Sequence, residues 1–114
     1  MQAQRDFHQK QMQKLHTFIQ RWNGGKARLW EFQAGHCSLT IRVEREGTRG
    51  NLHIVCLGPA FIHGPVAWEQ CDFEVGDHVV VGDQADGYVL RDRAAGFEVY
   101  TEGLDVFEHC KPIY

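Results

Sequence analysis

The stretch LHTFIQRWNGGKARLWEF, residues 15–32, contains the change of pattern that decides the fold. Before the Asn-Gly-Gly break at 23–25, apolar side chains recur at steps of three and four residues, which places them on one face of an α-helix. After the break, Trp30 and Phe32 alternate with polar residues, which is the period of a β-strand. Asn and Gly tolerate the left-handed backbone that ends a helix, so the break itself predicts the helix terminus.

Upstream of the break, the helical pattern extends back to residue 3. Its apolar face is made by His8, Met12, Leu15, Ile19 and Trp22, joined by Phe18. A helix over residues 3–22 is about 30 Å long, whereas a typical strand spans only about 17–20 Å. We therefore expect the second half to dock on a sheet. The first half has only Ala3, Phe7 and Met12 as apolar residues and should overhang it.

Downstream, the period of two persists to the end of the chain. The segment HCSLTIRVE, residues 36–44, is the cleanest strand, and the glycine-flanked loop 46–50 predicts a hairpin into a strand over 51–57. Because proline cannot donate to a sheet ladder, the Gly-Pro pairs at 58–59 and 64–65 predict a turn, a bulge or an edge. Further strands are expected at residues 66–75, 77–81, 88–92, 97–101 and 106–114.

These patterns predict one domain over residues 1–114, of the α+β class. An N-terminal amphipathic helix (1–23) would pack on a bent antiparallel sheet of six or seven strands (26–114), a β-roll or half-barrel. Connections this short favour antiparallel pairing, because parallel strands need a long crossover. Two registers are possible for the first hairpin, with Val43 paired either with His53 or with Ile54. The two registers place the His53 side chain on opposite faces of the sheet.

Composition indicates a compact domain: 43% of the 114 residues are hydrophobic and 24% are charged. No apolar run approaches the roughly 20 residues of a membrane helix, and the polar first residues do not match a secretory signal, so we expect a cytoplasmic protein without a membrane partner. The four cysteines at 37, 56, 71 and 110 are then expected to be reduced. Cys37, Cys56 and Cys71 are in phase with apolar neighbours, which predicts burial.

Known catalytic and cofactor motifs do not occur. The chain has no P-loop, GxGxxG, HExxH, GxSxG or CxxC motif, and Ser38 is its single serine. We therefore predict no catalytic residue, no cofactor and no metal motif, and we do not expect an enzyme. His53 and His63 could approach each other if the chain folds back. Further metal ligands could only be guessed among His78, Asp83 and Asp86.

Charge is distributed unevenly along the chain. Residues 1–30 carry six basic residues and one acidic residue, +5, and the remainder carries six against fourteen, −8, which together give the net −3. Such asymmetry can indicate a basic arm for nucleic acid, or a basic helix attracted to the acidic face of its own body or of a second copy. The basic residues are spread over 24 positions without a cluster, so we favour the second interpretation and do not expect nucleic-acid binding.

The leading functional hypothesis is a non-enzymatic protein-interaction module that forms a homodimer through the N-terminal helix, with Phe7 and Met12 as contact residues. The alternative is a small-ligand or metal-binding domain, or a small enzyme, with a pocket near His53, His63 and Trp68. In this alternative, Phe61 lines a groove beside the kinked Gly-Pro segment.

Overall fold

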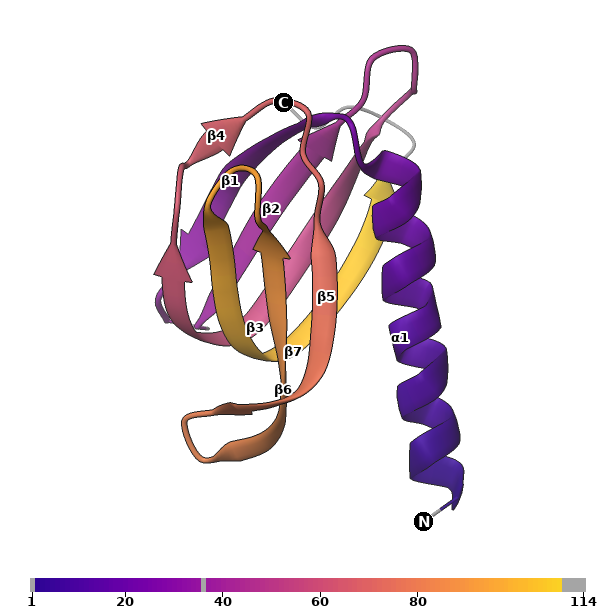
Figure 1. Cartoon of the computed structure of the whole chain (residues 1–114), viewed down its shortest axis with the longest axis vertical. Coiled ribbons are helices and arrows are strands. Elements are labelled where there is room, and N and C mark those ends of the chain that lie inside the picture. The colour runs from indigo at the N-terminus through magenta and orange to yellow at the C-terminus, as the bar shows by residue number, and fades with distance from the viewer. Residues whose placement is uncertain (1, 36, 110–114) are drawn as a thin grey trace.

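The computed structural model describes residues 2–35 and 37–109 and has one helix followed by seven strands (Figure 1). The elements are α1 (Gln2–Trp22), β1 (Lys26–Gln33), β2 (Ser38–Glu44), β3 (Asn51–His63), β4 (Ala67–Trp68), β5 (Glu74–Val81), β6 (Gln84–Asp92) and β7 (Phe97–His109). All strand pairs are antiparallel and form one sheet in the order β4-β1-β2-β3-β7-β6-β5. The predicted α+β architecture is confirmed.

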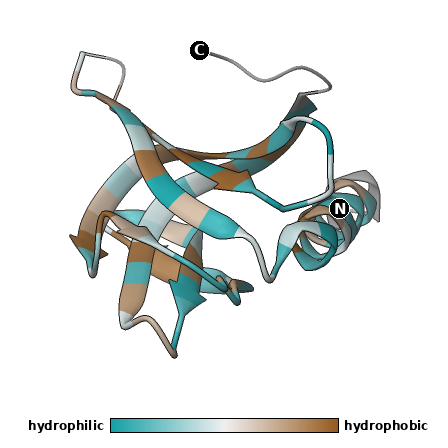
Figure 2. Cartoon of the chain, turned by 90° about the horizontal axis from the view of Figure 1, so that it is seen from above, coloured by the Kyte–Doolittle hydropathy of each residue, from teal (hydrophilic) through white to brown (hydrophobic). Residues whose placement is uncertain are grey.

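The sheet is strongly bent and does not close into a barrel. Strands β3 and β7 are 13 residues long and pair along almost their whole length. The first half of β3 also pairs with β2, and the first half of β7 also pairs with β6, so the two long strands belong to both sides of the bend (Figures 1 and 2). Gly58, at φ +66°, and a bulge between Pro59 and Phe61 mark the bend in β3.

Helix α1 lies beside the sheet, against the second half of β7 and against β5 (Figure 1). Leu15, Ile19 and Trp22 are almost completely buried in the core, which confirms that the second half of the helix docks. The first half is also attached, because the His8 side chain contacts Asp77 of β5.

The core lies on the concave face of the sheet. It is built by alternating side chains of β2 and β3, namely Leu39, Ile41 and Val43 opposite Cys56, Ile54 and Leu52, and it is completed by Leu90, Phe97, Val99, Leu104 and Val106. Val43 pairs with Leu52, so neither of the two expected registers occurs. Arg42 pairs with His53, which places His53 on the convex face, away from the core.

The helix ends where the sequence predicts. Gly24 adopts φ +95°, and the Asn23 side chain hydrogen-bonds to both backbone groups of Phe73. Asn23 thus joins the end of α1 to the start of β5.

Several strand boundaries were predicted wrongly. The Gly58-Pro59 pair is followed by a bulge, one of its expected outcomes, but β3 continues past residue 57 to His63. The expected strand over 97–101 and the described part of that over 106–114 belong to one strand, β7, which runs through Gly103 without a break. Within the expected strand 66–75, only Ala67–Trp68 is a separate strand, and the next strand begins at Glu74. The predicted strand over 106–114 extends beyond the described residues.

The cysteines divide into two kinds. Cys56 and Cys71 are free and buried, as expected, but Cys37 is exposed in the turn before β2 with φ +48°, so its predicted burial is wrong. Cys110 lies outside the described residues. Within the described part of the chain, no helix has the length and apolarity needed to cross a membrane.

Candidate functional site

The residues expected to form a ligand pocket do not all meet. Phe61 and His63 lie at the end of β3 and Trp68 lies in β4, whereas His53 lies near the start of β3. The two histidines are ten positions apart on the same strand, which corresponds to about 30 Å along the chain. His53 and His63 therefore do not converge.

Trp68 has a packing role. Its ring contacts the rings of Phe73 and Phe97 at centroid distances of 5.5 and 4.8 Å, and its Nε1–H donates to Asp92 Oδ2 at 2.8 Å. Phe61 is half-exposed and packs edge-on against Tyr100. His63 lies 3.3 Å from the carbonyl oxygen of Gly96 and lines a hollow of about 540 Å³ beside the β6–β7 turn.

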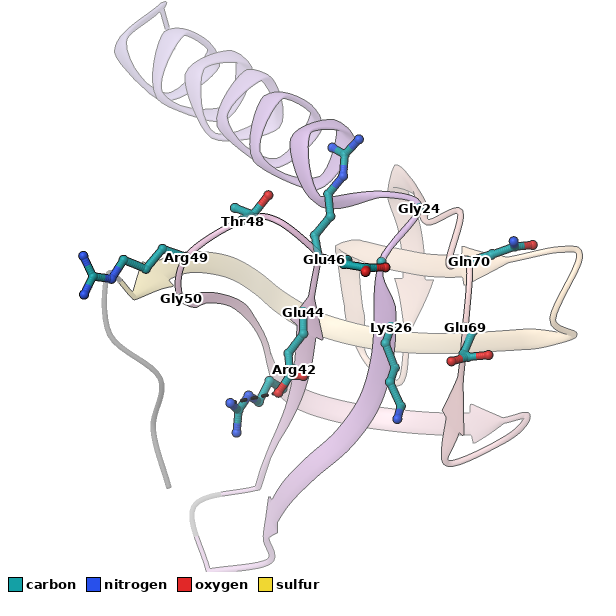
Figure 3. A pocket seen from close by; sticks show the side chains of 12 residues that line it. Gly24, Lys26, Arg42, Glu44, Glu46, Thr48, Arg49, Gly50, Glu69 and Gln70 are labelled. Atoms are coloured by element: carbon teal, nitrogen blue, oxygen red, sulfur yellow. Dashed lines mark ion pairs between the residues drawn. The ribbon is translucent and has the colours of Figure 1, made fainter.

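A larger hollow, of about 950 Å³, lies between the end of α1, the β2–β3 hairpin and the segment after β4 (Figure 3). Its side chains carry both signs of charge: Lys26, Arg42, Arg45 and Arg49 against Glu44, Glu46 and Glu69. Arg42 and Glu44 form an ion pair at 2.9 Å, and Arg49 points away from the other side chains. This mixture favours neither a cationic nor an anionic ligand.

Among the residues that the structure describes, one compact group of ligating side chains joins α1 to β5. His8 Nε2 lies 2.7 Å from Asp77 Oδ2, and His78 Nε2 lies 3.3 Å from the same oxygen. The three ligand atoms all lie within 4.8 Å of one another. Two imidazoles and a carboxylate are side chains that can bind a transition metal together.

An irregularity in β5 brings Asp77 and His78 together. In a regular strand, neighbouring side chains point to opposite faces, which would separate these two residues. The register of β5 against β6 shifts between Gly76 and Val79, and His78 adopts the left-handed conformation at φ +56°. This bulge turns both side chains toward α1.

Acidic groups surround this His8–Asp77–His78 cluster. His78 Nδ1 lies 3.3 Å from Asp86 Oδ1, so each nitrogen of the ring faces a carboxylate. The contact with His8 holds the pKa of Asp77 below its usual value. Burial, together with the negative charges of Asp77, Asp86 and Asp105, raises the pKa of Tyr88, whose ring stacks on His8. The local electrostatic potential is therefore favourable to a cation.

A second feature lies along the seam between α1 and β7. Phe7 and Phe18 are eleven residues apart, three helical turns, and so lie on one stripe of α1. The Lys14 ammonium lies over the rings of Phe18 and Phe107 at 5.9 and 5.4 Å and also binds Asp105 at 2.9 Å. Phe7 is 73% exposed and Phe107 is 45% exposed, whereas Met12 is half-buried against the core.

No protein family, curated protein or solved structure matches this chain. Function is therefore inferred from the geometry of the described side chains. Sequence reasoning named His78 and Asp86 only as guesses and missed His8 and Asp77 as their companions. The one signal available was Gly76 directly before the Asp-His pair, because glycine inside a strand often marks a bulge.

Proposed function

We propose that this chain is a non-enzymatic protein-interaction domain that forms a homodimer through the first half of α1. The observation that carries the proposal is the exposure of Phe7, 73%, at the end of the aromatic stripe shared with Phe18 and Phe107. Exposed aromatic side chains are enriched at protein interfaces and contribute much of their binding energy. Two-fold pairing is the commonest way for one such surface to cover another.

The uneven distribution of charge supports a second copy of the same chain as the partner. The first 30 residues carry +5 and the rest of the chain carries −8. Lys14 and Arg21 are already paired with Asp105 and Glu108 of the same chain, but Lys10 is exposed on the first half of the helix. The acidic body of a second copy is complementary to this basic segment.

The two buried thiols are unsuited to act as catalytic nucleophiles. Burial raises the pKa of Cys56 to about 12 and that of Cys71 to about 11, so neither forms a thiolate near neutral pH. We propose a cytoplasmic location, and the three free cysteines among the described residues support it, because free thiols are typical of reducing compartments.

Analytical ultracentrifugation of the full chain tests this function. We expect a concentration-dependent dimer that Phe7→Ala weakens at least about tenfold, the scale of a truncated aromatic contact. Phe32→Ala is the matched control. Phe32 is also exposed, 58%, but it lies on β1, toward the edge of the sheet opposite to β5, on which α1 packs. A full chain that stays monomeric at its highest soluble concentration overturns the proposal, and so does an equal effect of both variants.

A second candidate is a small-ligand site at the hollow beside His63. The supporting observation is the position of His63 and Phe97 at this hollow of about 540 Å³, beside Arg91 and Arg93, which pair with Glu98 and Glu74. Thermal-shift measurements against a panel of small metabolites of both charges test it. The expected result is a rise in melting temperature that His63→Ala removes, and no shift with any of these compounds in the wild-type chain argues against the site.

A further inference from the structure

We propose that His8, Asp77 and His78 form a binding site for a divalent transition-metal ion. Within residues 2–35 and 37–109, this is the one group in which three or more ligating side chains come together in this way. Its members come from α1 and β5, and His8 and Asp77 are 69 residues apart in the chain. The site is separate from the aromatic stripe of α1 and does not depend on dimer formation.

The distances are close to those of a coordinated ion. Zinc binds histidine nitrogen and carboxylate oxygen at about 2.0–2.1 Å, which places neighbouring ligand atoms of a tetrahedral site about 3.3 Å apart. Asp77 Oδ2 is 2.7 Å from His8 Nε2 and 3.3 Å from His78 Nε2. All three ligand atoms lie within 4.8 Å of one another, so binding one ion requires the side chains to rotate and the 2.7 Å contact to lengthen.

The backbone conformation at His78 supports the proposal that these three side chains form a binding site. A residue with a side chain rarely adopts the left-handed conformation of His78, and such strain costs on the order of 1–3 kcal/mol. Strained residues are concentrated at binding and catalytic sites, where the strain places a side chain that regular structure could not. Here it places His78 on the same side as Asp77.

The surroundings match those of known metal ligands. A histidine that binds a metal through one nitrogen usually donates the other N–H to a carboxylate or carbonyl group, which fixes the ring. Asp86 lies at this position, 3.3 Å from His78 Nδ1. The stacking of His8 on Tyr88, with centroids 6.0 Å apart, restricts the second ring in a similar way.

Three protein ligands leave at least one coordination position for water or for a donor atom of a ligand. A hollow of about 740 Å³ adjoins the cluster and is lined also by Lys10, Met12 and His16 of α1. The open position would face solvent here, since the His78 side chain is 68% exposed.

Isothermal titration calorimetry with Zn²⁺, on the full chain freed of metal by a chelator, tests the site. We expect one ion per chain, with a loss of affinity of at least about 100-fold in His8→Gln and His78→Gly and of about tenfold in Asp86→Asn. His8→Gln keeps an amide that can donate to Asp77. His78→Gly suits the left-handed backbone, so this variant should keep or raise the melting temperature while it loses the metal.

His16→Gln is the matched control, because His16 lines the same hollow but is not part of the cluster. Its Zn²⁺ affinity should stay within about twofold of the wild type, as expected for a residue that does not bind the ion. Co²⁺ should give the visible absorption of a four-coordinate N/O site in the wild type and not in His78→Gly. The proposal is overturned if the wild type does not bind Zn²⁺, if His8→Gln and His78→Gly bind it as tightly as the wild type, or if His16→Gln weakens binding equally. Phe7→Ala should retain the metal, which separates this test from that of the dimer.

Discussion

Trp68 donates its indole N–H to Asp92 Oδ2 at 2.8 Å, which ties the short edge strand β4 to the end of β6. The same oxygen accepts the backbone N–H of Asp72 at 2.8 Å, and Asp92 Oδ1 accepts that of Ala95. One buried carboxylate therefore connects β4, the segment before β5 and the β6–β7 turn.

Asp92→Ala should destabilise the fold. It leaves the donors of Trp68, Asp72 and Ala95 without this acceptor, and a buried donor left unsatisfied costs about 1–3 kcal/mol. Urea denaturation followed by tryptophan fluorescence measures the loss. Asp83→Ala, in the exposed turn between β5 and β6, is the control and should change the free energy of unfolding by less than about 0.5 kcal/mol. Equal midpoints for the two variants would show that the Asp92 network contributes nothing.

Gly25→Ala should also be destabilising. A Cβ at this position would lie 2.2 Å from the carbonyl oxygen of Glu44, which is backbone and cannot move alone. The Gly25 carbonyl also accepts the N–H of Cys71, so a shift here disturbs a second segment. We expect a loss of more than about 1 kcal/mol, whereas Gly35→Ala, with open space around its Cβ, should be neutral or stabilising. Thermal unfolding of both variants checks this, and an unchanged melting temperature for Gly25→Ala would contradict it.

The free energy of unfolding should decrease at acid pH, in part because the Asp105 carboxylate becomes protonated. Burial opposes its charge, but Lys14, the Val106 N–H and Gln11 together hold the pKa of Asp105 below its usual value. A carboxyl with a depressed folded-state pKa stabilises the fold above its unfolded pKa, and this contribution is lost as pH falls through the folded value. Between about pH 5 and pH 2, the free energy of unfolding of Asp105→Asn should therefore fall less steeply than that of the wild type. Parallel curves for the two proteins would refute this role of Asp105.

The thiols should react at very different rates. Because burial raises the pKa of Cys56 to about 12 and that of Cys71 to about 11, both should resist alkylation in the folded protein at mildly alkaline pH. Cys37 is exposed and should be modified quickly. Peptide mapping after timed alkylation measures each site, and a denatured sample is the control in which all react. Fast modification of Cys56 in the folded chain would contradict its burial.

The sequence predicts the local elements of this fold well and its long-range geometry less well. The apolar periodicity identified α1 to within a residue, and alternation identified β1 and β2. The Gly-Pro pair at 58–59 was interpreted as a turn, a bulge or an edge, and the structure has a bulge inside a strand that continues. Pairing of β3 with the distant strand β7 decides whether the strand continues or ends, and a single sequence does not contain that information.

The candidate metal site was missed for a related reason. The rule that neighbouring residues in a strand point to opposite faces excludes Asp77 and His78 as joint ligands. The left-handed backbone of His78 breaks this rule, and His8 joins the pair only because α1 packs on β5. Both causes depend on tertiary structure, whereas the exposure of Phe7 followed directly from the helical pattern.

The packing of α1 on the sheet also affects how the chain folds while it is being translated. The helix precedes the strands in the chain, and β7, one of the strands that it contacts, is made after the others; at roughly 5–20 residues per second, translation needs about 4 to 17 s to pass from residue 22 to residue 109. Until β7 is complete, Leu15, Ile19 and Trp22 lack part of the surface that buries them in the folded protein. Incorrect apolar contacts of this helix are therefore a hazard of folding during translation.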